Sequence, residues 1–373
     1  MPLTLVTGPA NAEKAGHVLA AYRAALDREP LLVVPTAADV ERYRRELAAA
    51  GAVFGVQVLR FAWLERELAR RAEVAGRPLG ALARERVAAA AIARTELRRL
   101  AGSAATPGFL PAFLALVDEL EERRISPGRW YAALRAWAAD APGRADYAEE
   151  LAALYGAYRD ALDRLGRRDA RLNAVAALDA LRLDPGRWGG TPVFLYGFDD
   201  LTALQRDAIE TLAVHCGADV VVSLTYEPGR AAFAGRGATF QELLALGAEH
   251  VALEASADHY AALGLHDLER GLFEAGAEPF DPGGGVMLLE GGGERAELEL
   301  VAAHVARLIR AEGVAPEEIA VVLRAPDEQA ALLADVFSAA ATRSSTRWPR
   351  STRCGSIPPG GARRPCSSTA STT

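Results

Sequence analysis

The sequence predicts an α/β protein built on a parallel sheet, with a large all-helical insertion and an incomplete second α/β domain. Two observations predict this class. Short apolar runs typical of buried strands alternate with helical patterns on either side of a long middle segment, as expected for parallel strands joined by crossover helices. In that middle segment, residues 79–185, the strand pattern disappears, and Ala, Leu, Arg and Glu recur at helical spacing.

The first part of the predicted sheet domain spans residues 1–78. Its strands are apolar runs that stop at proline or polar residues, and helical patterns separate them. Because such strands are parallel, their carboxyl ends meet at one edge of the sheet, where ligands bind. The predicted elements are strands over Leu3–Thr7, Leu31–Val34 and Val56–Phe61, and helices over Asp39–Ala50 and from about Ala62.

The segment 79–185 is expected to form four to six helices, separated at Pro-Gly pairs. Residues 186–240 then complete the sheet. They supply a strand over Pro192–Tyr196, a helix over Thr202–His215 and a strand over Asp219–Leu224. The helical block is therefore predicted to be an insertion between two halves of one sheet domain.

Residues 241–340 are expected to form an incomplete second α/β domain. A helical stretch rich in Gly and Ala comes first, and two apolar runs separated by a long amphipathic segment follow it. The predicted elements are strands over Val286–Leu289 and Ile319–Leu323, and helices over Glu294–Glu312 and Asp327–Phe337.

The segment 341–373 has a different composition. It consists mainly of Ser, Thr, Arg, Pro and Gly, has no leucine and shows no apolar periodicity. Such a segment buries too little apolar surface to offset its ordering entropy, so we expect it to be disordered. The abrupt change suggests the hypothesis of a frame-shifted tail. Translating the gene in the other two frames from about codon 338 tests this, because one frame should continue an α/β pattern.

Lys14 is the only lysine among 42 basic side chains, and it follows a strand and a loop that opens with glycine. A strand, a loop, a lysine and a helix in this order are the layout of a phosphate-binding P-loop, whose backbone N–H groups and lysine hold phosphates. The candidate nucleotide-binding residues are Gly8, Pro9, Ala10, Asn11, Ala12, Glu13, Lys14 and Ala15.

Two positions depart from the P-loop pattern. Glu13 stands where the pattern has its second glycine, which removes backbone freedom and adds a charge that repels phosphate. Ala15 replaces the Ser or Thr whose hydroxyl normally binds magnesium. We therefore weigh two interpretations: a P-loop fold with weak or absent catalysis, and an ordinary strand-to-helix turn with a surface lysine.

Over about residues 1–340 the chain resembles the AddB/RexB subunit of bacterial helicase–nuclease repair complexes, which is similar to UvrD-type superfamily 1 helicases. The order and spacing of several short motifs carry this resemblance. They are the P-loop-like start, Val33–Thr36, Val58–Phe61, Tyr155–Leu162, Leu165–Asp169, Phe194–Thr202, Val222–Thr225, Glu294–Glu299 and Pro316–Arg324.

The resemblance implies a RecA-like P-loop sheet and a role in double-strand break repair. The partners it implies are DNA, single-stranded by expectation, and an AddA-type helicase–nuclease subunit. It also implies a C-terminal PD-(D/E)XK nuclease domain with an iron–sulfur cluster. The chain has only three cysteines, Cys216, Cys354 and Cys366, so we expect no cluster and no nuclease activity in this polypeptide.

Family members often carry Asp-Gly-Phe after the strand that supplies the second magnesium ligand. Here Tyr196 precedes Gly197 and Phe198, and Asp199 and Asp200 follow in a displaced register. These two acids either substitute in part for the missing ligand or cap the next helix. Glu13, Ala15 and Tyr196 each replace a residue that P-loop proteins use to bind the nucleotide or its metal ion. Together they predict that binding of ATP and Mg²⁺ is weak or lost.

Arg60, Trp63 and Arg324 are candidates for contact with DNA or phosphate. Arg60 lies near the end of one predicted strand and Arg324 directly follows another, and guanidinium groups suit phosphate. Trp63 lies where superfamily 1 proteins contact single-stranded DNA, and its ring is suited to stacking on bases. The alternatives are solvated or ion-paired arginines and a tryptophan buried against the insertion.

Composition excludes several other classes. The net charge is −7, and the segment 341–373 contributes six arginines and no acid, so the first 340 residues carry −13. An acidic body argues against a broad cationic nucleic-acid surface. No apolar run is long enough to cross a membrane, no signal peptide is recognised and no His or Cys spacing suggests a metal site. We expect a cytoplasmic protein.

The sequence thus predicts a helicase-like, ATPase-inactive subunit of a DNA repair complex that guides or scans DNA. Two alternatives remain at this point. One is an active ATP-dependent motor with an atypical P-loop, and the other is a generic P-loop enzyme such as a nucleotide kinase.

Overall fold

The computed structural model describes residues 2–49, 55–74 and 78–342 of the chain. Within these residues the chain forms two compact units. The sheet unit comprises residues 2–259 and 273–275, and the second unit comprises residues 260–272 and 276–342. Each unit is described by itself.

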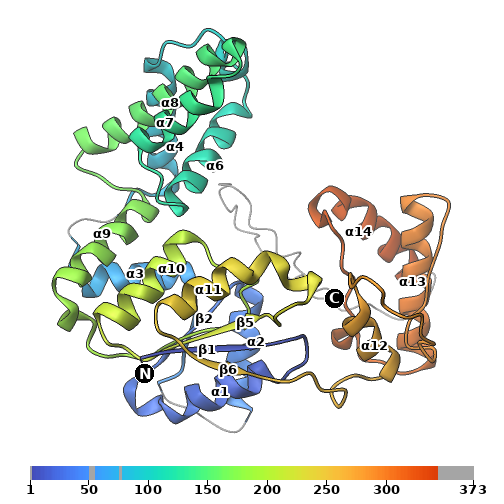
Figure 1. Cartoon of the computed structure of the whole chain (residues 1–373). Coiled ribbons are helices and arrows are strands. Elements are labelled where there is room, and N and C mark those ends of the chain that lie inside the picture. The colour runs from blue at the N-terminus through green and yellow to red at the C-terminus, as the bar shows by residue number, and fades with distance from the viewer. Residues whose placement is uncertain (1, 50–54, 75–77, 343–373) are drawn as a thin grey trace, which may run out of the picture. The chain divides into compact units, whose positions relative to one another are not determined.

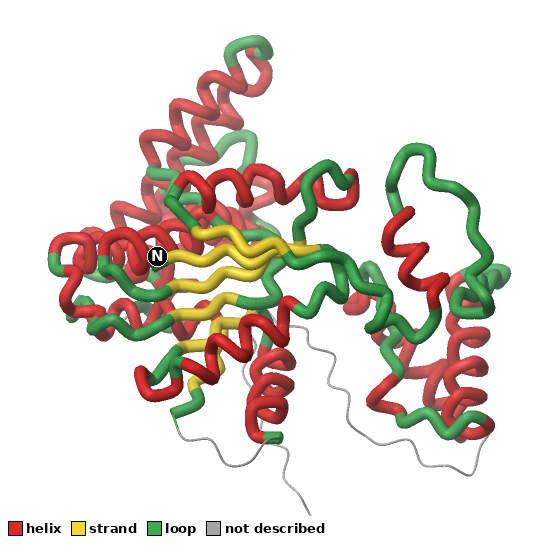
Figure 2. The backbone as a smooth tube through the Cα atoms, turned by 60° about the horizontal axis from the view of Figure 1, so that its bottom comes forward, coloured by secondary structure: helices red, strands yellow, loops and turns green. Residues whose placement is uncertain are grey.

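The sheet unit is built on six parallel strands in the order β3-β2-β4-β5-β1-β6 (Figures 1 and 2). The α/β class and the parallel sheet predicted from the sequence are therefore confirmed. β1 leads into the candidate nucleotide-binding loop, and β4 leads into Tyr196, Asp199 and Asp200. These two strands are not neighbours, because β5 lies between them. The strands are β1 (Leu3–Gly8), β2 (Leu31–Val34), β3 (Gln57–Arg60), β4 (Val193–Leu195), β5 (Val220–Thr225) and β6 (Glu249–Ala252).

Helices cover both faces of this sheet, because alternate residues of the central strands point to opposite faces. Leu32 and Val34 share one apolar core with α1 (Lys14–Ala24) and α2 (Ala37–Ala48). Leu31 and Val33 lie in the other core. That second core also includes residues of α3 (Phe61–Arg71), α9 (Ala170–Leu183), α10 (Ala203–Glu210), its π-helical continuation Thr211–His215, and α11 (Gly237–Ala245).

The sheet continues beyond the expected boundary at residue 240. α11 packs on the sheet, and β6 pairs with β1 in parallel register, with Leu5 opposite His250. β6 is an edge strand with mostly exposed side chains and a single β-branched residue, Val251. It therefore lacks the apolar run by which the inner strands are recognised in the sequence.

The predicted insertion is helical, and the described residues from 78 to 192 form no strand. α4 to α8 have apolar cores of their own, one of which contains Phe113 and Tyr158. α9 instead packs on α3 and belongs to the sheet's core. The helices are α4 (Ala81–Arg94), α5 (Ala101–Ala104), α6 (Phe109–Glu122), α7 (Pro127–Ala138), α8 (Ala145–Arg164) and then α9.

The second unit contains α12 (Leu263–Gly271), α13 (Glu294–Ala311) and α14 (Pro326–Thr342). α13 and α14 pack around Leu298, Ala302 and Val336. The expected strands over 286–289 and 319–323 are not formed. A parallel strand needs neighbours on a covered sheet, and the described residues of this unit provide no sheet.

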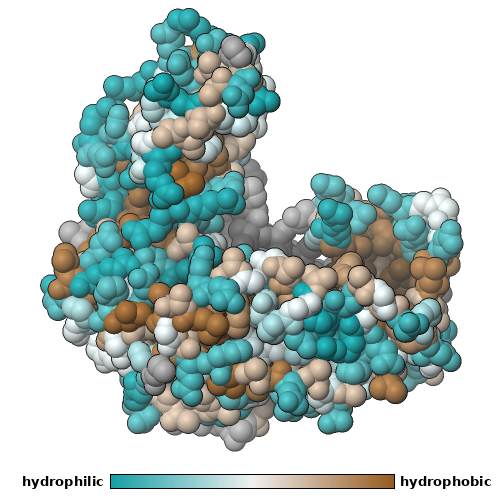
Figure 3. Space-filling view, viewed as in Figure 1, coloured by the Kyte–Doolittle hydropathy of each residue, from teal (hydrophilic) through white to brown (hydrophobic). Residues whose placement is uncertain are grey.

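Apolar side chains of these two segments are left on the surface. Leu288 is 88% exposed and Val322 is 90% exposed, and apolar surface appears over this unit in Figure 3.

Short 3-10 turns join other elements of the chain. They cover Leu26–Arg28, Pro142–Arg144, Pro185–Trp188, Ala231–Arg236 and Pro316–Glu318. The tail prediction concerns residues 341–373, of which 343–373 lie outside the described residues.

Candidate functional site

The loop between β1 and α1 follows a tightly curled path. Asn11 and Glu13 both adopt left-handed backbone conformations, with φ of +56° and +57°. At Gly8 a Cβ atom would lie 2.8 Å from the carbonyl oxygen of Leu253 and 2.9 Å from the Cβ of Ala12, so only glycine fits without displacing the backbone. Glu13 thus holds a backbone conformation that favours glycine, the residue that the P-loop pattern has there.

Lys14 begins α1 and is only 7% exposed. Its Nζ donates hydrogen bonds to the carbonyl oxygens of Gly8, at 3.0 Å, and Pro9. The interpretation of Lys14 as a surface lysine is therefore wrong. A buried ammonium group needs such acceptors, and here the loop's own carbonyl groups supply two of them.

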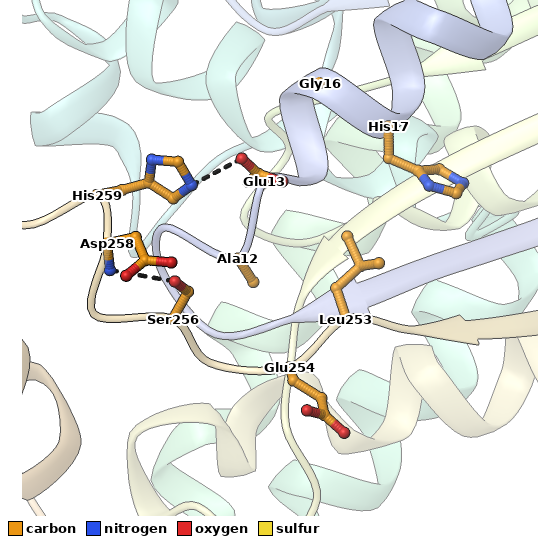
Figure 4. Close-up of a pocket in the computed structure, with 9 residues that line it drawn as sticks. All are labelled: Ala12, Glu13, Gly16, His17, Leu253, Glu254, Ser256, Asp258 and His259. Carbon is orange, nitrogen blue, oxygen red and sulfur yellow. Dashed lines mark hydrogen bonds and ion pairs between the residues drawn. The ribbon is translucent and has the colours of Figure 1, made fainter.

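A cavity of about 560 Å³ adjoins this loop (Figure 4). The Nε2 atom of His259 lies 2.7 Å from Oε1 of Glu13, and Figure 4 shows this pair at the edge of the cavity. Among the described residues, three carboxylates and no lysine or arginine line the cavity, so its local charge opposes a phosphate group. The lining residues are Ala12, Glu13, Gly16 and His17 before and within α1, and Leu253, Glu254, Ser256, Asp258 and His259 after β6.

Tyr196 follows β4 and faces α2. Its backbone N–H donates to the carbonyl oxygen of Val33 at 3.0 Å, and its ring lies edge-on to Tyr43, with 5.5 Å between ring centroids. Burial, together with Tyr196, raises the pKa of Tyr43. Tyr196 thus takes part in apolar packing on the face that α1 and α2 cover.

Asp199 and Asp200 both bind groups close to α11. Asp199 accepts a hydrogen bond from Arg236 at 3.1 Å, and its side chain is 95% exposed. Oδ1 of Asp200 accepts from the backbone N–H of Leu201, at 2.8 Å, and from the Thr239 hydroxyl, at 2.6 Å. The cap of α10 is Thr202, which forms a capping box with Gln205. Both aspartates therefore have structural partners.

These residues do not fit a magnesium ion held beside a nucleotide. Ala15 offers no hydroxyl, and Oδ1 of Asp200 accepts two hydrogen bonds from protein groups. Across the described residues, no group of three or more His, Cys, Asp or Glu side chains is arranged to hold a metal ion. The donor set that P-loop enzymes use for Mg²⁺ is therefore incomplete at this loop.

The candidate DNA contacts lie in different parts of the chain. Trp63 on α3 is 54% exposed, and the Arg66 guanidinium lies 4.4 Å from its ring centroid. The alternative in which Trp63 is buried against the insertion is therefore wrong. Arg60 precedes α3 and has no ion pair or hydrogen bond from its side chain within the described residues. Arg324 is exposed in the second unit.

Sequence reasoning missed the segment after β6 that lines the cavity. Leu253 packs against Gly8, and His259 contacts Glu13, whereas the sequence predicts that this segment belongs to the second domain. The only sequence feature that could have indicated a strand here is the alternation of Val251 and Leu253, with one residue between them. That alternation is too short to distinguish a strand from a loop.

None of the helices in the described part of the chain is long and apolar enough to cross a bilayer. No protein-family model matches the chain, and no curated protein sequence matches it at a significant level.

Proposed function

We propose that this chain is a helicase-like, ATPase-inactive subunit of a bacterial DNA break-repair complex that guides single-stranded DNA beside an ATP-driven, AddA-type partner. One observation carries the ATPase-inactive part. The loop keeps a P-loop-like path, but Lys14 is bound by the loop's own carbonyl groups and Glu13 occupies the expected glycine position. The repair role rests on the sequence resemblance.

The electrostatics of the loop support this proposal. A P-loop attracts phosphate through backbone N–H groups at a helix N-terminus and through its lysine. Here a carboxylate sits at that N-terminus and is paired with His259 at 2.7 Å. Two further carboxylates, Glu254 and Asp258, line the adjoining cavity. A triphosphate entering this region would meet repulsion without a metal ion to offset it.

Calorimetric titration with ATP, with and without Mg²⁺, tests the inactive site. We expect no magnesium-dependent binding, and the same result for wild type and Lys14→Ala. Tight, magnesium-dependent binding that Lys14→Ala abolishes would establish the active-motor alternative instead.

Trp63 supports the DNA-guiding role. It is an exposed aromatic ring with an arginine on its face, and Arg60 at the end of β3 lacks a partner among the described residues. Aromatic rings stack on bases regardless of sequence, and nearby arginines bind the phosphate backbone. We therefore place single-stranded DNA along the start of α3.

Binding of a fluorescent oligothymidine, measured with the partner subunit present, tests this role. Trp63→Ala should weaken binding about tenfold, since stacking on one base is worth about 1–3 kcal/mol, and salt should weaken it further. Trp137→Ala is the matched control, because Trp137 is 47% exposed and Arg144 lies 4.8 Å from its ring centroid. Equal losses in both variants, or no binding by wild type, would refute the role.

A further inference from the structure

The helical insertion has a groove of its own between α4 and α8, with a cavity of about 290 Å³. Small apolar side chains, including Ala90 of α4 and Ala157 and Ala161 of α8, line it. Leu165 also lines the groove and is 57% exposed. We call this feature the α4–α8 groove. Its narrow side chains allow another helix to approach the two backbones closely.

Three arginines line the same groove: Arg86 and Arg94 of α4, and Arg164 of α8. All three are exposed, and none has an ion pair or hydrogen bond from its side chain within the described residues. Other arginines of the insertion do have acidic partners. Arg84 binds Asp118, for example, with 2.8 Å between Nη2 and Oδ1. The α4–α8 groove therefore combines an apolar lining with uncompensated positive charge, in a chain whose first 340 residues carry −13.

We propose that the α4–α8 groove docks an acidic amphipathic helix of a partner protein. The alanines and Leu165 would contact the apolar face of that helix, and the arginines would bind carboxylates on its two flanks. A nucleic acid suits the groove less well, because a phosphate backbone gains nothing from an alanine-lined surface and would lose hydration there. This inference does not depend on the proposed DNA role.

The positions of the arginines define the acidic pattern of the docked helix. Arg86 and Arg94 are eight residues apart on α4, which is about 12 Å along the helix axis. Carboxylates seven or eight residues apart on one flank of the partner helix match this spacing. Arg164 is on the other helix of the pair, so it requires an acid on the opposite flank.

Fluorescence anisotropy with the full chain tests the proposal. The probe is a labelled 18-residue peptide with an Ala/Leu stripe and glutamates on both flanks, and the matched probe has lysines instead. The glutamate peptide should bind and the lysine peptide should not. The Arg86→Glu/Arg94→Glu variant should bind the glutamate peptide at least about tenfold more weakly than wild type. Added salt should also weaken binding to wild type.

The control is Arg23→Glu/Arg129→Glu, which reverses two exposed arginines outside the groove and should leave peptide affinity unchanged. Ala90→Gln should block the groove sterically, and circular dichroism should show that every variant remains folded. Equal binding of the two peptides, no binding of either, or an unchanged affinity after reversal of Arg86 and Arg94 would overturn the proposal. So would a single-stranded oligonucleotide that displaces the peptide and loses affinity in the same variant, since that would indicate a nucleic-acid surface.

Discussion

Glu13 shows how one residue can keep a loop's path and lose its chemistry. Its left-handed φ of +57° costs a residue with a side chain roughly 1–2 kcal/mol. Glycine avoids this cost but loses roughly 0.5–1 kcal/mol more chain entropy on folding. Glu13→Gly should therefore raise the free energy of unfolding by about 0.5–1 kcal/mol, measured by urea denaturation.

Glu13→Ala is the control for this substitution. It also removes the carboxylate and its exposed contact with His259 but keeps the left-handed backbone strain. The alanine variant should be less stable than the glycine variant. If the two variants have equal stability, the loop is not strained at residue 13.

Glu121 is a buried acid of the helical insertion, only 3% exposed. Burial, reinforced by the neighbouring Asp169, raises its pKa from 4.5 to about 10. Between these two values the unfolded chain ionises this group whereas the folded chain keeps it protonated. Unfolding then releases a proton, so stability falls as pH rises.

Glu121→Gln removes this pH dependence, because an amide does not ionise. We compare the free energy of unfolding of the variant with that of wild type at each pH. The variant minus wild-type difference should be about 1–3 kcal/mol larger at pH 8 than at pH 6. Denaturation at both pH values measures it. Glu119→Gln, an exposed change on the same helix, should follow wild type. Parallel curves for Glu121→Gln and wild type would show that Glu121 is ionised in the folded chain.

At the scale of elements, one carboxylate ties the chain between α4 and α5 to α8. Glu150 accepts hydrogen bonds from the backbone N–H groups of Arg98, Arg99 and Leu100 at 2.8 to 2.9 Å. Glu150→Gln replaces one acceptor with an N–H donor, so it should lower the free energy of unfolding by about 1–3 kcal/mol. Thermal and urea melts measure this loss, and the exposed neighbour Glu149→Gln is the matched control.

The same group predicts a loss of stability in acid. Burial raises the pKa of Glu150, but the three backbone hydrogen bonds outweigh that effect and hold it below the usual value of 4.5. Its stabilising effect is therefore present above pH 4.5 and is lost as pH falls through the lower, folded-state pKa. The Glu150→Gln variant should lack this loss of stability in acid. If its unfolding free energy falls with pH in the same way as that of wild type, the lowered pKa of Glu150 is contradicted.

At the scale of the whole molecule, the second unit carries exposed apolar segments. Leu288 and Val322 are among the most exposed large apolar residues of the described chain, and such patches promote association. Leu288→Ser/Val322→Ser should reduce self-association, measured by size-exclusion chromatography with light scattering, and change the unfolding free energy by less than about 0.5 kcal/mol. Val336→Ser, at a residue only 2% exposed, should instead destabilise its unit. Unchanged association in the double variant would show that other surfaces cause it.

The inner strands could be predicted from sequence because they are buried on both faces. Leu31–Val34 is an unbroken apolar run, all four residues are buried in the structure, and such runs are typical of central parallel strands. The helices of the insertion were predictable for a similar reason, since their apolar spacing is long and regular. The strand before the loop and the helix that begins at Lys14 could also be predicted, because both are visible in the local sequence pattern.

Long-range contacts decided the rest. β6 becomes a strand through pairing with β1, although its own residues carry almost no strand signal. The segments 286–289 and 319–323 have that signal but no sheet to join among the described residues. What Glu13 would contact depended on His259, which lies far away in the chain. Apolar periodicity is a local property that the sequence displays directly, whereas strand pairing and side-chain partners arise only when distant segments meet.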